Sequence, residues 1–421
     1  MSEWAIVFVG GCVLGWALVE RRLASTAVTG PMAFVALGLL AGSDGLGIIE
    51  VDSDRATSTV NIVLEGTLAL VLFTDAAALH PASWRKDAGL PSRLLGIGLP
   101  LTIATGWLVA LLLFDDLGVW EAAIVGAIVA PTDAALGKAV ISNPRVPERI
   151  RTGLDVESGL NDGVSLPFIL IFMALAQEDL GDNEIVNTFV REIGVAVAVG
   201  VGVGLLAGWL LIQAGRLKWM GPSWNRIAIV AVAIIAFATA DQLDGSGFIA
   251  CFVGGLTFGG TTRGRLQDSD VFASDLGSLL TQVSFLLVGA VVVGPALGDA
   301  TWQIWLMAVL ALTVARIGPV ALSLIGTGMR PPTVAYLGWF GPRGLATVVF
   351  AVLVVNDADL PGNDLIVTTA AITVGLSVYA HGLSANLGAN RYADWYESHD
   401  QPTDLAEGQP LKQHPIRAPR P

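Results

Sequence analysis

Long apolar stretches alternate with short polar segments along almost the whole chain. A helix needs about 20 mostly apolar residues to cross the hydrocarbon core of a bilayer, and about thirteen stretches approach that length. The pattern therefore predicts an all-α polytopic membrane protein, in which the eighth and ninth stretches could also form one hairpin. The predicted spans are 4–19, 26–42, 57–79, 94–114, 118–140, 157–176, 193–214, 226–240, 246–260, 276–298, 302–326, 332–355 and 363–387.

The composition agrees with this location. Of the 421 residues 53% are hydrophobic and only 14% are charged, whereas soluble chains carry about 25% charged residues. The net charge of −13 disfavours nucleic-acid binding, because no basic patch is left to hold phosphates. The two cysteines and four histidines have no metal-ligand spacing. We therefore expect neither an enzyme nor a bound cofactor.

The positions of the basic residues predict the orientation in the membrane. Lysine and arginine concentrate in short cytoplasmic loops. With the N-terminus outside, 19 of the 23 basic residues fall in inside segments or in the C-terminal tail. We therefore expect an inner or plasma membrane protein with its N-terminus outside and its C-terminus in the cytoplasm. Residues 388–421 are predicted to form a disordered cytoplasmic tail after a transmembrane domain of residues 1–387.

Ionisable residues inside the predicted spans are the main functional signal, because a charge at membrane depth is costly. Five acids and two arginines are found there, so negative charge is in excess. A site of this composition favours a cation. The seven residues are Glu65, Asp75, Asp133, Glu157, Asp162, Arg316 and Arg343.

Two spans are interrupted by proline, at Pro131 and at Pro342. Proline removes a helical hydrogen bond, and broken backbone inside a membrane is tolerated only where it faces protein or water. The two breaks lie seven spans apart, so they run in opposite directions. This arrangement predicts two inverted repeats, of about residues 1–176 and 226–387, with crossed broken helices and a linker helix at about 193–214.

The sixth span begins with a stripe of oxygen-bearing side chains. Ser158, Asp162 and Ser165 share one helix face, and Glu157 and Asn161 share the next. Hard cations prefer carboxylate, carbonyl and water oxygens over sulfur or imidazole. The stripe therefore indicates an alkali cation and disfavours a transition metal.

Five motifs, in this order along the chain, resemble the NhaP/NHE-type sodium/proton exchangers of the cation/proton antiporter superfamily, which have an NhaA-like antiporter fold. The most specific of them is the Glu-Ser-x-x-Asn-Asp pattern. The motifs are Phe73-Thr74-Asp75, Pro131-Thr132-Asp133, Glu157-Ser158-Gly159-Leu160-Asn161-Asp162, Ala315-Arg316 and Gly341-Pro342-Arg343-Gly344.

The resemblance implies a role for each matching residue. Asp162 would hold either the proton or the cation, and the neutral Asn161 would make the exchange electroneutral. A transported Na⁺ would lie among Asp162 and the following residues: Asp133, Ser158, Thr132 and Asp75.

Three charged residues would be structural under the same resemblance. Glu157 would pair with Arg316 and steady Asn161, and Arg343 would neutralise the other broken helix. Asp133 also has a local explanation, because an aspartate after a break can cap the next helix. Two departures from the family pattern, Asp75 in place of a frequent glutamate and Ala134 in place of a common proline, bear on ion selectivity.

The sequence thus predicts a secondary active antiporter that exchanges Na⁺ or Li⁺ for H⁺ and contributes to pH homeostasis. A K⁺/H⁺ exchanger on the same scaffold, a cation channel and a sensor that does not transport are the alternatives. The resemblance also implies a homodimer. Two histidines, His80 and His381, lie near the predicted cytoplasmic ends of spans, and a boundary position is favoured over a pH-sensing role.

Overall fold

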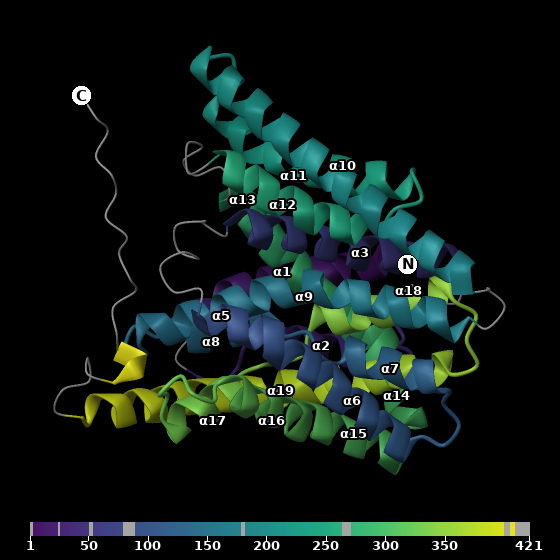
Figure 1. The fold of residues 1–421 in the computed structure, drawn as a ribbon, viewed down its shortest axis with the longest axis vertical. Helices are drawn as coiled ribbons and strands as arrows, with labels where there is room; N and C mark the ends of the chain where they lie inside the picture. Colours follow the sequence, from purple (N-terminus) through teal and green to yellow (C-terminus); the bar gives the residue numbers. More distant parts are fainter. Residues whose placement is uncertain are drawn as a thin grey trace.

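The computed structural model describes residues 3–23, 26–49, 54–78, 89–177, 182–262, 271–399 and 405–408. Within these ranges the regular structure is helical and contains no strand (Figure 1). Nine helices in the described ranges are long and apolar enough to cross a membrane, and four shorter apolar helices accompany them. The predicted all-α polytopic fold is therefore confirmed.

The helices follow the predicted spans closely. The first half contains α1 (Glu3–Leu23), α2 (Gly30–Ala41), α3 (Asp54–Ala78), α5 (Gly89–Arg93), η1 (Leu94–Gly98), α6 (Leu99–Leu113), α7 (Val119–Ile128), α8 (Ala134–Ile141) and α9 (Glu148–Ala176). The second half contains α10 (Asp182–Arg216), α11 (Pro222–Asp241), α12 (Gly247–Thr262), α13 (Val271–Val288), η2 (Gly289–Val293), α14 (Gly294–Asp299), α15 (Trp302–Leu312), α16 (Val314–Ser323), α17 (Pro331–Trp339), α18 (Leu345–Asp357), α19 (Asn363–Glu397) and η4 (Ala406–Gly408).

The segments η1 and η2 are π-helical turns inside longer helices. Each is followed within two residues by a proline, Pro100 or Pro295. Since proline has no N–H for the carbonyl four residues earlier, a wider turn keeps the chain helical at these places.

The helices form two groups with α9 between them. In one group α3, α10, α11 and α12 pack together, and in the other α6, α7, α15 and α19 do so (Figure 1). Helix α9 contacts α3, α10 and α12 of the first group and α7 of the second. The sixth predicted span, with its oxygen-bearing stripe, therefore lies at the centre of the molecule.

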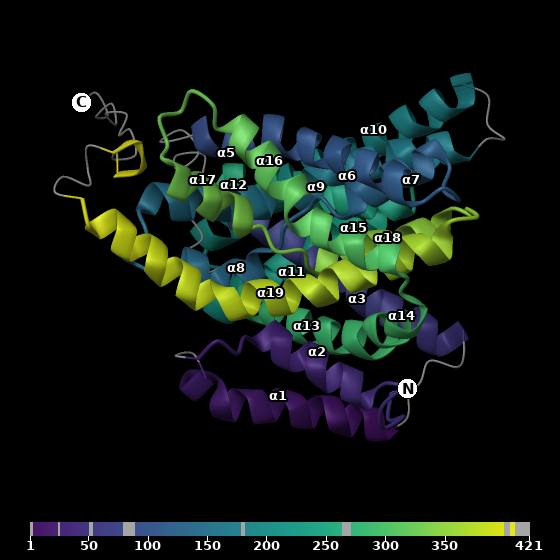
Figure 2. The same ribbon diagram turned by 90° about the horizontal axis from the view of Figure 1, so that it is seen from below.

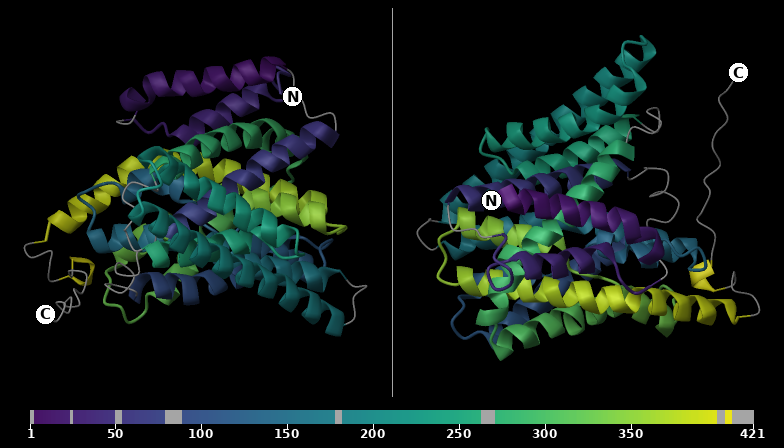
Figure 3. Two further views of the ribbon diagram at one scale, coloured as in Figure 1. Left: turned by 90° about the horizontal axis from the view of Figure 1, so that it is seen from above. Right: turned by 180° about the vertical axis from the view of Figure 1, so that it is seen from behind.

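Helices α1 and α2 form one edge of the molecule (Figures 2 and 3). Helix α2 packs on α13 and η2, and α1 packs on α2 and α13. The outward side chains of α1 are large and apolar, such as Trp4 and Leu18. Such a surface suits lipid or a second copy of the chain. The division into inverted repeats stays a prediction, and the proposed linker 193–214 lies within α10.

The prediction of a disordered tail from residue 388 is wrong for residues 388–397, which continue α19 (Figure 3). Two contacts explain why. The ring of Tyr392 stacks on Tyr336 with centroids 4.3 Å apart, and Arg145 forms salt bridges to Asp394 and Glu397. The polar sequence of this segment predicts disorder, whereas a few aromatic and charged side chains dock it on the helical domain.

A second tail segment, residues 405–408, also packs on the helical domain. Glu407 is fully buried, and its Oε1 atom accepts hydrogen bonds from Arg330 N and Thr333 Oγ1, both at 2.7 Å. The carboxylate therefore caps the first turn of α17. Residues 400–404 and 409–421 lie outside the described residues.

The expected boundary position of His381 is also wrong. Because α19 continues to Glu397, His381 lies well inside this helix, and only 1% of it is exposed. His80 lies outside the described residues.

Candidate cation-binding site

The two predicted helix breaks are present and cross each other. The first separates α7 from α8 at residues 129–133, and the second separates α17 from α18 at residues 340–344. The backbone N–H of Asp133 donates to the carbonyl of Pro342 at 2.7 Å. The prediction of crossed broken helices is thereby confirmed.

Asp133 caps two helices at once. Its Oδ1 accepts from the N–H groups of Ala135 at 2.7 Å and Leu136 at 3.4 Å, at the start of α8. Its Oδ2 accepts from the N–H of Leu345 at 3.0 Å, at the start of α18. Free N–H groups at a helix N-terminus favour a carboxylate. Both oxygens therefore join the two broken segments.

Arg343 makes the reciprocal contact from the second break to the first. Its side chain is fully buried, and Nη1 donates to the carbonyls of Ala130 and Pro131, the latter at 3.1 Å. These carbonyls follow the end of α7, where the break removes their helical partners. The positively charged guanidinium group of Arg343 therefore lies against carbonyl dipoles at the first break.

Glu157 and Arg316 form a buried ion pair with two hydrogen bonds, one of them 2.8 Å between Arg316 Nη2 and Glu157 Oε2. Both side chains are at most 3% exposed. The Arg316 side chain passes over Gly341, where an added Cβ would collide with it. The pair thus fastens α9 to α16 beside the second break.

Asn161 is held differently from the expectation. Its Nδ2 donates to Thr132 Oγ1, not to the carboxylate of Glu157. Thr132 Oγ1 also lies 3.1 Å from Ser158 Oγ. Three predicted site residues, one from the first break and two from α9, are therefore joined by hydrogen bonds.

Asp162 lies one turn beyond Ser158 on α9. Its Oδ1 is buried and has no hydrogen-bond partner within the part of the chain that the structure describes, and the same holds for Asn161 Oδ1. The carboxylates of Asp133 and Asp75 act on Asp162 electrostatically. Asp75 packs on the same face of α9, because an added Cβ at Gly159 would lie 3.5 Å from its Cβ.

The structure therefore brings together all the predicted ion-site residues. The two aspartates differ, because both carboxylate oxygens of Asp133 cap helices, whereas Asp162 has a buried oxygen without a hydrogen-bond partner in the described ranges. Among the described residues no group of three His, Cys, Asp or Glu side chains is arranged to hold a metal ion. The assignment of Na⁺ to these side chains stays a prediction.

Comparison with known proteins decides the family. The model of the transmembrane sodium/hydrogen exchanger family matches residues 6–387. The chain belongs to this sodium/hydrogen exchanger family. The family prediction from the five motifs is thus confirmed.

Two relatives and one solved structure illustrate the similarity. The chain is 29% identical over 374 residues to the K(+)/H(+) antiporter NhaP2 of Shewanella oneidensis, and 26% identical over 378 residues to the K(+)/H(+) antiporter NhaP of Alkalimonas amylolytica. These alignments cover 85% and 87% of this chain, but only 62% and 63% of the relatives. The sodium proton antiporter MjNhaP1 of Methanocaldococcus jannaschii has the same fold, with 22% identity, a TM-score of 0.74, and coverage of 92% of this chain and 98% of that one.

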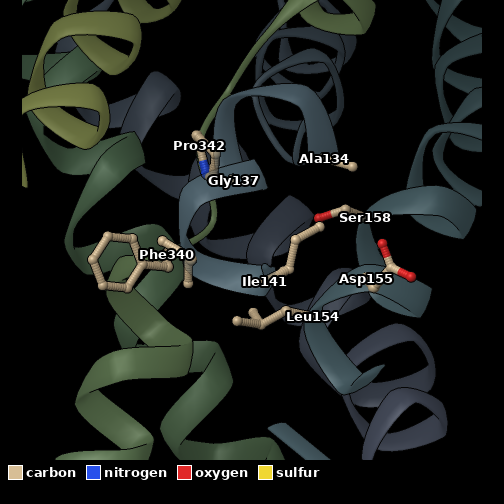
Figure 4. A pocket seen from close by; sticks show the side chains of 9 residues that line it. Ala134, Gly137, Ile141, Leu154, Asp155, Ser158, Phe340 and Pro342 are labelled. Atoms are coloured by element: carbon tan, nitrogen blue, oxygen red, sulfur yellow. The ribbon is translucent and has the colours of Figure 1, made fainter. Parts of the chain in front are cut away.

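A pocket lies beside the point where the two breaks cross (Figure 4). On one side lie Ser158 and Asp155 of α9, on the other Phe340 and Pro342 of the second break, with α8 between them. The pocket therefore lies between α8, the second break and the helix that carries Asp162.

Asp155 was missed from the sequence, because the sixth span was predicted to begin at residue 157. The signal was available, since Asp155 precedes Ser158 by three residues and Asp162 by seven, and so lies on the same helix face. Asp155 and Asp75 also interact electrostatically. The acidic stripe thus extends from the pocket to Asp162.

Glu65 lies apart from this stripe. Its charged neighbours are Asp357 and Asp241, at the ends of α18 and α11. The acids that act on Glu65 are therefore not those of the candidate site.

Proposed function

We propose that this chain is a secondary active antiporter that exchanges a monovalent cation, Na⁺ or Li⁺, for H⁺ across an inner or plasma membrane. The observation that carries the proposal is the buried Oδ1 of Asp162, which has no hydrogen-bond partner among the described residues. Asp162 follows Ser158 by one helical turn, and the hydroxyl group of Ser158 contacts Thr132 of the first break, which crosses the second.

Competition for Asp162 accounts for coupled exchange. A buried carboxylate loses hydration and is stabilised either by a proton or by a cation. If only the occupied site crosses between the inward and outward orientations, each cation moved one way is matched by protons moved the other way. Movement of one helix group against the other would give alternating access.

A K⁺/H⁺ antiporter is the second candidate, because two relatives carry that activity in their names. The same oxygen ligands suit any alkali cation. The chain spans about 62% of the length of the NhaP2 relative, so its activity is a proposal for this chain and not a transfer from that relative.

Loss of exchange in Asp162→Asn is the central prediction. The protein is reconstituted into liposomes that contain a pH-sensitive dye, and Na⁺, Li⁺ and K⁺ gradients are imposed in turn. We expect cation-driven proton movement in the wild type and none above background in the mutant, because a neutral amide takes up no proton and has no negative charge to balance a bound cation.

Asp244→Asn is the matched control, because Asp244 has an exposed carboxylate, paired with the equally exposed Arg191, and its loss changes the charge in the same way. It should leave exchange unchanged. Persistent exchange in Asp162→Asn would refute the proposal, and cation flux without proton movement would indicate a channel.

Exchange should be electroneutral. Asn161 contributes no charge beside Asp162, so one carboxylate serves one cation or one proton in each cycle. We expect the exchange rate to stay the same when a K⁺ and valinomycin diffusion potential is imposed during Na⁺-driven exchange. A rate that follows the imposed voltage would show unequal charge movement.

We further propose a homodimer with the N-terminus outside and the C-terminus in the cytoplasm. The exposed apolar face of α1 supports a lipid or partner contact, and the basic loops support the orientation. Cross-linking in membranes and accessibility of single introduced cysteines to impermeant reagents test the two points separately.

A further inference from the structure

Two polar side chains of α19 are buried behind the second break, where the family motifs and the ion site do not account for them. Ser377 and His381 lie one helical turn apart and are 0% and 1% exposed. Buried polar groups require hydrogen-bond partners. The partners here lie on both ends of the break between α17 and α18.

His381 holds the end of α17. Its Nε2 lies 2.9 Å from the carbonyl of Trp339, the last residue of that helix. The same carbonyl also accepts from the N–H of Gly341 at 2.9 Å. The imidazole ring also packs beside the indole of Trp339, with centroids 5.1 Å apart.

Ser377 holds the other end of the break. Its hydroxyl oxygen accepts a hydrogen bond from the backbone N–H of Arg343 at 2.6 Å and lies 3.1 Å from His381 Nδ1. Ser377 and His381 together therefore bridge Trp339 and Arg343 across the interrupted turn.

The partners assign the hydrogen positions. A carbonyl only accepts, so Nε2 of His381 carries the hydrogen that bonds to Trp339. Nδ1 then carries no hydrogen, and its lone pair accepts the hydroxyl hydrogen of Ser377. The carbonyl of Ser377 itself, 3.0 Å from Nδ1, would become an acceptor only if the ring gained a second proton.

The surrounding charges favour the neutral ring. The cations that act on the imidazole are Arg343 of the break and Arg316 of α16. Like charges repel in a low-dielectric interior. The neutral ring therefore satisfies both of its nitrogen atoms and adds no charge.

We propose that His381 and Ser377 are positioning residues of the exchange site, with His381 acting as a neutral donor and acceptor that holds Arg343 in register with the first break. Arg343 in turn binds the carbonyls of Ala130 and Pro131, directly before Thr132. Hydrogen bonds thus link α19 to Pro131, and the next residue in the chain, Thr132, carries the hydroxyl group that contacts Ser158. The inference rests on the proposed exchange for its transport readout.

The decisive variants are His381→Gln and His381→Leu. A glutamine side chain ends in one donor and one acceptor, as the neutral imidazole does, and leucine has neither. Both proteins are reconstituted as full chains, and the apparent KM for the cation, the maximal rate, the pH profile and the thermal midpoint are measured.

We expect His381→Gln to keep the apparent KM within about twofold and to keep the wild-type pH profile. His381→Leu should raise the apparent KM about tenfold, the effect of losing one hydrogen bond of about 1.4 kcal/mol. The maximal rate should change less than KM, because the carboxylate of Asp162 is intact.

Ser384→Ala is the control on the same helix, since the partners of the Ser384 hydroxyl among the described residues are the indole N–H of Trp339 and carbonyls of α19. It should leave KM unchanged. If His381→Leu does not fold, Ser377→Ala tests the same bridge and should also raise KM several-fold.

Three results would overturn the inference: an unchanged KM in both His381→Leu and Ser377→Ala, an equal defect in His381→Gln and His381→Leu, or a displaced pH profile in His381→Gln. Absence of exchange in the wild type would instead refute the proposed function. In that case a thermal midpoint that falls in His381→Leu and is kept in His381→Gln would still support the bridge.

Discussion

The two broken segments cross each other and carry side chains of opposite charge. The first break carries a carboxylate, Asp133, and the second carries a guanidinium group, Arg343. Each reaches across to the other segment: Asp133 caps α18, and Arg343 binds the carbonyls after α7. The N–H groups at the start of α18 and the carbonyls after the end of α7 thus each find a partner on the opposite broken segment.

The surroundings of the two breaks also differ. Thr132 of the first break contacts Ser158 and Asn161 beside Asp162, whereas the second break is supported by Ser377 and His381 of α19. We therefore expect substitutions at the second break to lower stability and, through Arg343, also cation affinity, whereas substitutions at the first break should affect mainly cation affinity.

The largest expected effect is that of Arg343→Met. The variant leaves two buried carbonyls without their donor, and each unsatisfied group costs about 1–3 kcal/mol, so we expect a loss of about 3 kcal/mol in the free energy of unfolding. Arg391→Met is the control, because Arg391 is exposed near the end of α19. Unfolding in detergent, followed by thermal or denaturant titration, measures both. A stable Arg343→Met protein would show that the two breaks cross without the guanidinium group of Arg343.

Gly344→Ala should have the next largest effect. An added methyl group would overlap the carboxylate of Asp133 and displace it from the α18 cap. Overpacking of this kind costs about 1–3 kcal/mol. Gly66→Ala is the matched control, since Gly66 lies in α3 with open space around its Cβ position. Equal thermal midpoints for the two variants would show that the crossing tolerates a wider separation.

Ser158→Ala should have the smallest effect on stability, about 1 kcal/mol or less, because one hydrogen bond is lost. Its effect on apparent cation affinity should be a few-fold, since Thr132 loses the hydroxyl partner beside Asp162. Ser165→Ala is the control on the same helix, because the buried Ser165 hydroxyl has no partner among the described residues. A larger loss of affinity in the control would contradict the assignment of the cation to the first break.

Much of the fold was predictable from the sequence because its causes are local. Apolar length predicts the spans, and Pro131 and Pro342 predict the breaks, since proline acts on its own turn. The motif around Asn161 and Asp162 predicted the family. The pattern of one helix also placed Ser158 and Asp162 on a common face.

The errors arose where contacts between distant residues decide the outcome. Residues 388–397 read as a polar tail, yet the stacking of Tyr392 on Tyr336 extends α19. His381 was predicted at a helix boundary because the continuation of α19 was not foreseen. Asp155 was missed because the predicted start of the span excluded it.

By itself the sequence determined that the chain is an all-helical membrane protein with two broken segments and a cation-favouring excess of acids. Only the tertiary structure decided which acid is free. Asp133 lies in an interrupted segment and Asp162 in a central helix. Leu345 bonds Asp133 from 212 residues away, whereas Asp162 has an oxygen that finds no hydrogen-bond partner in the part of the chain that the structure describes. The reason is physical, since a carboxylate's partners depend on which helix ends meet in space, and a helix end can meet one that lies far away in the sequence.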